Sequence, residues 1–177
     1  MALDNAHGFS LVQSQDDVLI RPFIVTSAAV VQIGDVVIQG STAGTVSAAT
    51  AAGEHLWGVC LDSVTGDGTK TARIVIDPMA IYRVQVANTG AFPATNVGKG
   101  HDIGTFTAGS TNTSGMELDP DEATNSGEGQ FLLLGIAAGT APYAAGAAAL
   151  PGYGTSLLTE AIVMVNPIEF QWTTPVT

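Results

Sequence analysis

Basic side chains are scarce in this sequence. Its 177 residues include five Lys and Arg against 16 Asp and Glu, which gives a formal net charge of −11. Nucleic acids and anionic membranes are bound through clustered cations that displace counterions or attract lipid headgroups. Here the cations are scattered, at Arg21, Lys70, Arg73, Arg83 and Lys99. We therefore expect no nucleic-acid partner and no membrane partner.

Cysteine pairs and long apolar runs are also missing. Cys60 is the single cysteine, so the chain has no internal disulfide and no thiolate metal cluster. The sequence contains no run of about 18 apolar residues that would predict a transmembrane helix. Its N-terminus lacks the basic and apolar regions of a signal peptide. We expect the protein to be made and folded in a cytoplasm.

Charged residues of both signs make up only 12% of the chain, whereas 46% is hydrophobic. Soluble monomers usually carry more charge on their surface. Two interpretations follow from this composition. Either a neighbouring subunit covers part of the surface, or Ser, Thr, Gly and Ala provide the solvated surface in place of charge.

Short apolar, threonine-rich stretches fill the chain, and Gly, Pro, Asn or Asp separates them. Almost none has a helical period, whereas residues 79–86 alternate as a half-buried strand does. The pattern predicts an all-β fold, a small β-barrel or β-sandwich of β-tulip type, with long loops and extended termini. Residues 1–17 are interpreted as an N-terminal arm or edge strand, and residues 18–177 as a single β domain.

Several local predictions follow from turn residues and composition. Pro22 limits residues 18–25 to an edge strand or two short strands. Gly34-Asp35 and Gly66-Asp67-Gly68 are typical of hairpin turns between β-branched runs. Residues 117–128 are acidic and turn-rich, which predicts an exposed loop. Residues 130–137 form a short apolar run typical of a buried strand, with a helix as the alternative that the pattern alone leaves open.

The two halves of the chain share an approximate sequence echo. Three segments return in the same order, with a spacing that grows along the chain: Gly34-Asp35-Val36 as His101-Asp102-Ile103, Trp57-Gly58-Val59 as Leu134-Gly135-Ile136, and residues 73–79 as residues 162–168. Insertions at 117–128 and 138–154 account for the growth. The echo predicts two pseudo-repeated halves, about 18–90 and 91–177; chance similarity between β-rich segments is the alternative.

Residue patterns typical of catalysis are absent. The sequence has no Gly-x-Ser-x-Gly motif, and His55 and Cys60 would lie on opposite faces of a strand. The glycine-rich segment 98–104 has neither dinucleotide-binding nor P-loop spacing. The histidines and turn carboxylates match no metal-ligand spacing and no EF-hand loop; these are His7, His55, His101, Asp62, Asp67, Asp119, Asp121 and Glu122. We therefore predict no enzyme activity, no cofactor and no metal.

Aromatic residues near the chain ends are the candidate binding residues. Near the C-terminus, Ile168, Phe170 and Trp172 alternate with Glu169 and Gln171, which places the three apolar side chains on one face of a strand. Such residues either complete the protein's own core or anchor an interface. The same two roles are open for the N-terminal aromatics. The candidate partner-interface residues are Phe9, Phe23, Ile168, Phe170 and Trp172.

Several segments resemble small capsid decoration (cement) proteins of tailed bacteriophages. They are Ile33-Gly34-Asp35-Val36-Val37, Ala49-Thr50-Ala51-Ala52-Gly53, Trp57-Gly58-Val59 and Val163-Met164-Val165-Asn166-Pro167 with the aromatics that follow. In that family a Gly-Asp-x-Val strand start, an Ala/Gly-rich turn and a Gly-Val strand recur within a small β-barrel or β-tulip. The motifs are backbone-turn motifs and cover about half of the chain.

The resemblance implies a protein on the outer surface of an icosahedral shell, commonly a homotrimer. There it would bridge neighbouring copies of the major capsid protein. Two other functions stay open. One is another virion surface module, such as a fibre base or a spike. The other is a carbohydrate-binding β domain in which Trp57, Tyr82 or Trp172 stacks on a sugar.

Overall fold

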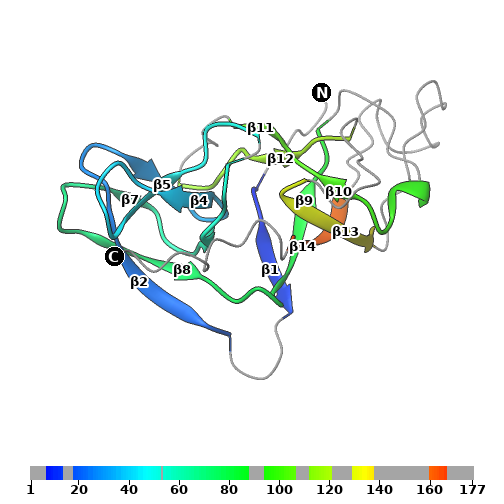
Figure 1. The fold of residues 1–177 in the computed structure, drawn as a ribbon, viewed down its shortest axis with the longest axis horizontal. Coiled ribbons are helices and arrows are strands. Elements are labelled where there is room, and N and C mark those ends of the chain that lie inside the picture. The colour runs from blue at the N-terminus through cyan, green and yellow to red at the C-terminus, as the bar shows by residue number, and fades with distance from the viewer. Residues whose placement is uncertain are drawn as a thin grey trace.

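The protein is built almost entirely of β-strands (Figure 1). The structure, a computed structural model, describes residues 7–13, 18–52, 54–87, 94–106, 112–120, 129–137 and 160–166. Within these ranges the single helical element is a short 3₁₀ turn, η1 (Ala94–Asn96). The all-β prediction is therefore confirmed.

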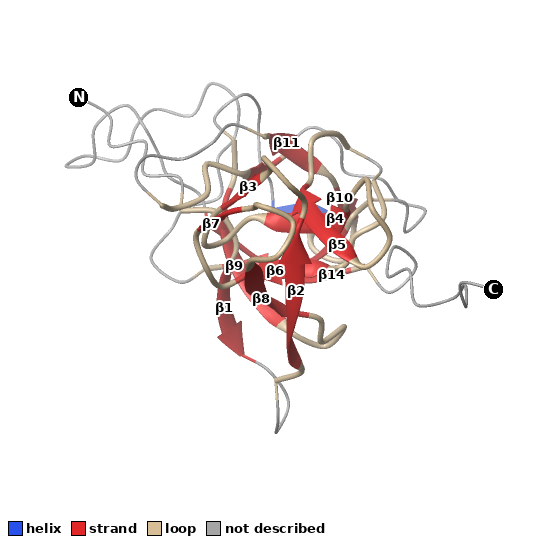
Figure 2. Ribbon diagram, turned by 90° about the vertical axis from the view of Figure 1, so that its left-hand side faces the viewer, coloured by secondary structure: helices blue, strands red, loops and turns tan. Residues whose placement is uncertain are grey.

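The first unit is a closed barrel, on the left in Figure 1 and nearest the viewer in Figure 2. Its strand order is β2-β5-β4-β6-β8. Every pair is antiparallel except β2 and β5, which run parallel. The strands are β2 (Ile20–Val25), β4 (Val36–Gln39), β5 (Thr45–Ala48), β6 (Gly58–Cys60) and β8 (Thr71–Val75). A separate two-stranded sheet of β3 (Val30–Val31) and β7 (Val64–Thr65) lies beside the barrel.

The second unit contains a five-stranded antiparallel sheet in the order β1-β9-β14-β13-β10. Its strands are β1 (Ser10–Gln13), β9 (Ile81–Gln85), β10 (Gly100–His101), β13 (Phe131–Ile136) and β14 (Glu160–Val165). After one intervening residue β10 continues as β11 (Ile103–Thr105), which pairs with β12 (Glu117–Leu118). β1 is the edge strand that residues 1–17 were predicted to supply.

The second unit repeats the strand path of the first. In the first unit β4 pairs with β6 and then β5, β6 pairs with β8, and β8 pairs with β2. In the second, β10 and β11 pair with β13 and then β12, β13 pairs with β14, and β14 pairs with β9. The closing contact also recurs: Thr26 N–H donates to Val46 O at 3.0 Å, and Ala87 N–H donates to Leu118 O at 2.9 Å. This correspondence supports the predicted pseudo-repeat.

The ladders refine the equivalences suggested by the sequence. Val75 corresponds to Met164 in both the echo and the ladders. The ladder partner of Val75 is Val59 and that of Met164 is Leu132, so Val59 corresponds to Leu132, not to Ile136.

The units meet at residues 76–80. The boundary predicted near residue 90 is too late, because β9 opens the second unit.

One continuous core joins the two units. The barrel interior contains Val37, Cys60 and Ile74, whereas their neighbours Val36, Val59 and Val75 belong to a cluster shared with the second unit. Successive residues of a strand point to opposite faces. At these positions the strands are therefore buried on both sides, which explains the consecutive apolar residues Val36-Val37, Val59-Cys60 and Ile74-Val75.

Two predicted hairpins are wrong, although both turns exist. Asp35 N–H donates to Gln32 O at 3.0 Å, so the chain does turn at Gly34-Asp35. However, β3 pairs with β7 while β4 pairs with β5 and β6. The turn at residues 66–68 likewise joins β7 to β8, which do not pair with each other. Each turn transfers the chain between sheets.

Two other local predictions need correction. Residues 20–25 form one strand within the closed barrel, and Pro22 is tolerated because β5 pairs with β2 only at Ile24 and Val25. The predicted exposed loop at 117–128 begins inside the structure, since Glu117 and Leu118 are buried in β12; residues 121–128 lie outside the described residues. The buried strand predicted at 130–137 is confirmed as β13.

Gly58 and Gly135, partners in the sequence echo, provide a matched test of this packing. At Gly58, φ is +150° and an added Cβ would lie 2.0 Å from Val75 O, whereas nothing lies within 4 Å of a Cβ at Gly135. We expect Gly58→Ala to lower the free energy of unfolding by about 3 kcal/mol or more, and Gly135→Ala by less than about 1 kcal/mol. Urea denaturation measures both; equal effects would contradict the close approach of β6 and β8.

Candidate functional site

Phe9 lies at the junction between the two units. Its backbone N–H donates to Gly34 O at 2.9 Å, at the start of β4. Its ring stacks on Phe131 of β13 with a centroid separation of 4.4 Å. Only 2% of Phe9 is exposed. Of the two roles left open for Phe9, the structure places it in the core of its own chain, so its assignment as a partner-interface residue is corrected.

The crossing beside Phe9 depends on two glycines. Gly34 has a φ of +87°, and an added Cβ would lie 2.7 Å from His7 O. Gly8 has a φ of +65°, and its Cβ would lie 2.3 Å from the Ser114 side chain. Residues 7–9 therefore pass between segments of both units at a separation that no side chain would permit.

The other predicted binding residues have different positions. Phe23 is half-buried and contacts Trp57 edge-to-face, with ring centroids 5.3 Å apart. Ile168, Phe170 and Trp172 lie outside the described residues. Tyr82 is completely buried in the shared core, so it cannot stack on a sugar, and that part of the carbohydrate-binding alternative is wrong.

A polar cluster that the sequence did not predict holds the N-terminal segment against the second unit. His7 Nε2 lies 3.2 Å from Glu160 Oε1, although the two residues are 153 positions apart. The other oxygen of Glu160 accepts a hydrogen bond from Arg83 Nη2. Ser10 Oγ lies 3.3 Å from His7 Nδ1. A serine, a histidine and a carboxylate are thus brought into one chain of contacts.

This cluster does not have the arrangement of a nucleophilic site. His7 Nδ1, the nitrogen nearest Ser10, also lies 3.0 Å from Gly8 O. A carbonyl only accepts hydrogen bonds, so this contact favours a proton on Nδ1, whereas a general base needs a free lone pair toward the serine. Arg83 holds the Glu160 carboxylate from its far side. The cluster is a polar tie between the N-terminal segment and strands β9 and β14.

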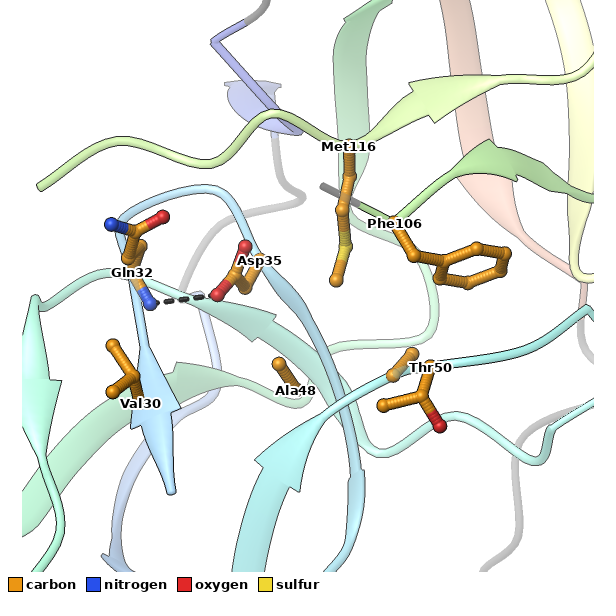
Figure 3. Close-up of a pocket in the computed structure, with 8 residues that line it drawn as sticks. Val30, Gln32, Asp35, Ala48, Thr50, Phe106 and Met116 are labelled. Atoms are coloured by element: carbon orange, nitrogen blue, oxygen red, sulfur yellow. Dashed lines mark hydrogen bonds between the residues drawn. The ribbon is translucent and has the colours of Figure 1, made fainter. Parts of the chain in front are cut away.

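A small pocket lies where the two units meet (Figure 3). Its volume is about 150 Å³. The first unit provides the Asp35 carboxyl and a wall of small residues; Phe106 and Met116 come from the second unit. The lining residues are Val30, Gln32, Asp35, Ala48, Ala49, Thr50, Phe106 and Met116. Its size and mostly apolar wall suit an aliphatic or aromatic side chain.

Asp35 is the titratable group of the pocket wall. Its Oδ2 accepts a hydrogen bond from Gln32 N–H at 2.8 Å. Burial raises the pKa of Asp35, and hydrogen bonds from the Ser114 side chain and the Gln32 backbone offset only part of that increase. A perturbed carboxyl in a pocket is a general indicator of function. Here its contacts hold the turn before β4 and tie that turn to Ser114 of the second unit, so we assign it a structural role.

Within the described segments, no side chains are arranged as a nucleophilic site or a metal site. Burial raises the pKa of the Cys60 thiol to about 12, which keeps it protonated and inert at neutral pH. No group of three or more His, Cys, Asp or Glu side chains there is placed to hold a metal ion. None of the helical structure in those segments is long and apolar enough to cross a membrane.

Comparison with protein-family models and with curated protein sequences gives no match for this chain.

Phe9 provides a test of the junction between the units. Because its ring is buried against Phe131, we expect Phe9→Ala to lower the free energy of unfolding by about 3–5 kcal/mol. Phe9→Leu should cost much less, since it keeps most of the apolar volume. Chemical denaturation of the two variants, with Phe23→Ala as the half-buried aromatic control, gives the comparison. A smaller loss for Phe9→Ala than for Phe23→Ala would contradict the junction.

Asp35 and Asp62 have pKa shifts of opposite direction, so their variants should respond to pH in opposite ways. The raised pKa of Asp35 means that its stabilising contribution is complete below its ordinary value of 3.8 and is lost as the pH rises through the folded-state pKa. Asp62 has a pKa lowered by its hydrogen bonds to Arg73, so its contribution is present above 3.8 and is lost as the pH falls. Asp35→Asn should therefore be less destabilising at pH 7 than at pH 4. Asp62→Asn should show the opposite pattern and be more destabilising at pH 7 than at pH 4. Unfolding free energies at the two pH values decide; equal pH slopes for both variants would contradict the assignment.

Proposed function

We propose that this protein is a structural component of a virion that decorates and stabilises an icosahedral bacteriophage capsid. It binds the outer surface of the shell and bridges neighbouring copies of the major capsid protein. In this proposal the protein is made in the host cytoplasm, acts on the virion surface and works as a homotrimer without any catalytic step.

The observation that carries the proposal is the position of the segments that resemble cement proteins. The Gly34-Asp35-Val36 segment opens β4, and Trp57-Gly58-Val59 opens β6. These strands pair directly, with Val36 opposite Val59 and Val37 opposite Gly58, inside a closed barrel. The motifs are thus adjacent in a small β-barrel, the setting that the resemblance implies for them.

The charge of the chain supports an outer rather than an inner location on the shell. A net charge of −11 with five basic residues is repelled by packaged DNA. Three of these five cations are already engaged in ion pairs, Arg73 with Asp62, Arg83 with Glu160 and Lys70 with Asp67. A surface with so little free positive charge suits contact with other protein better than contact with phosphate.

Stabilisation would act through mass action. A protein that binds the assembled shell but not its separated subunits shifts the equilibrium toward the shell. Each buried apolar Å² is worth roughly 25 cal/mol before the costs of association. Many symmetry-related copies multiply a modest interaction, so no single contact has to be strong.

The proposal predicts that capsids of the phage that encodes this chain lose heat resistance when they lack it and regain it when the purified protein is added. Binding is measured by co-sedimentation with the shells, and its location by electron cryomicroscopy. Unchanged heat resistance together with no added density on the shell would contradict the proposal.

Trp172 is the variant of choice in that experiment, because terminal aromatics are typical interface anchors. We expect Trp172→Ala to weaken shell binding by about tenfold or more while the circular dichroism spectrum stays unchanged. Met79→Ala, which truncates an exposed apolar side chain elsewhere, is the control. Sedimentation should give three times the 18.0 kDa chain mass for the unmodified protein. Loss of folded structure in Trp172→Ala would place Trp172 in the core instead.

A further inference from the structure

His101 occupies a position that is apolar in the first unit. Val37 pairs with Gly58 in the first ladder, and His101 pairs with Phe131 at the corresponding point of the second. Val37 lies in the barrel interior. His101 is likewise 0% exposed, and directly opposite Phe131 it shares a face with a core residue. The second unit thus contains an ionisable ring where the first has a valine.

The surroundings of His101 favour its neutral form. Its Nδ1 lies 2.9 Å from Asp119 O. A carbonyl only accepts, so the ring donates from Nδ1, and acid would add the second proton at Nε2, inside the unit. Two carboxylates, Asp119 and Asp102, favour that proton and Lys99 opposes it. Burial is the largest influence and lowers the pKa of His101 below its ordinary value.

We propose that His101 is a built-in acid trigger that loosens the second unit while the first unit stays closed. A group whose pKa is lowered in the folded state contributes stability above its unfolded pKa, and this contribution is lost as the pH falls. For histidine the loss begins near pH 6.5. The first unit has an uncharged side chain, Val37, at this point and should not respond in the same way. The trigger follows from the fold and does not depend on what the protein binds.

The location of the response is tested by hydrogen exchange of the full-length protein between pH 7.5 and pH 5. Protection factors, which correct for the intrinsic pH dependence of exchange, are compared between units. We expect those of β9, β13 and β14 to fall by up to about tenfold per pH unit below pH 6.5, because one proton is taken up on opening. Those of β4, β6 and β8 should change much less. An equal fall in both units would overturn the proposal.

Two variants assign the response to His101. His101→Val copies the residue of the first unit, and His101→Gln keeps a donor for Asp119 O without titrating in this range. In either variant the difference between units should disappear, whereas in the control His55→Gln, at an exposed position, it should persist. If neither His101 variant folds, side-chain NMR of the unmodified protein decides. The titration midpoint of His101 must lie below the ordinary histidine pKa of about 6.5; a midpoint at or above that value would overturn the proposal.

Discussion

The structure depends on one constraint: three barrel strands must bury both of their faces at once. β4, β6 and β8 each turn one residue into the barrel and the next into the core shared with the second unit, as Val36 and Val37 show in β4. Because the outward residues of the barrel cover the second unit, neither unit has a complete surface of its own. The low charge content of the chain is explained in part by this shared burial, since the parts of these strands that are buried on both faces, such as Ile74 and Val75 in β8, have no place for charge. A neighbouring subunit is not needed to explain that part of the composition.

Sequence reasoning succeeded where the information was local. Alternation in residues 79–86 and the apolar run at 130–137 identified β9 and β13, because side-chain period and burial leave a direct trace in composition. The turns at Gly34-Asp35 and residues 66–68 were also found. Their hairpins were not formed, because a turn fixes a change of direction but not the partner of the next strand. That partner was chosen by distant ladders, such as the one between β2 and β8.

The candidate site could be predicted only in outline. Phe9 was identified as an anchor, but its partner Phe131 belongs to a strand far along the chain, so nothing near Phe9 distinguished a core role from an interface role. The tie between His7 and Glu160 had no sequence signal, since it joins the two ends of the described chain. Glu117 was assigned to an exposed loop because its segment is acidic. It is instead buried, with Gln85 Nε2 donating to its carboxylate at 2.7 Å, and such a paired charge cannot be distinguished from a solvated one by composition.

Differences between the repeats explain why the N-terminal strand docks on one unit and not on the other. β1 pairs with β9 along the edge where Ser10 lies opposite Arg83. Pro22 occupies the corresponding position of β2. Thr26 N–H donates to Val46 O of β5. Backbone N–H groups alternate in direction along a strand, so the nitrogen of Pro22, four residues earlier, points to the same side of β2. At Pro22 that side is uncovered, because β5 pairs with β2 only at Ile24 and Val25. A proline nitrogen donates nothing, which removes the hydrogen bond that an added strand would need.

The aromatic stack also exists in the second unit alone. Phe131 stacks on Phe9, whereas Gly58, the equivalent of Phe131 in the first unit, has no side chain because Val75 O occupies the space. The two units thus share one strand path, but only the second can accept the N-terminal strand.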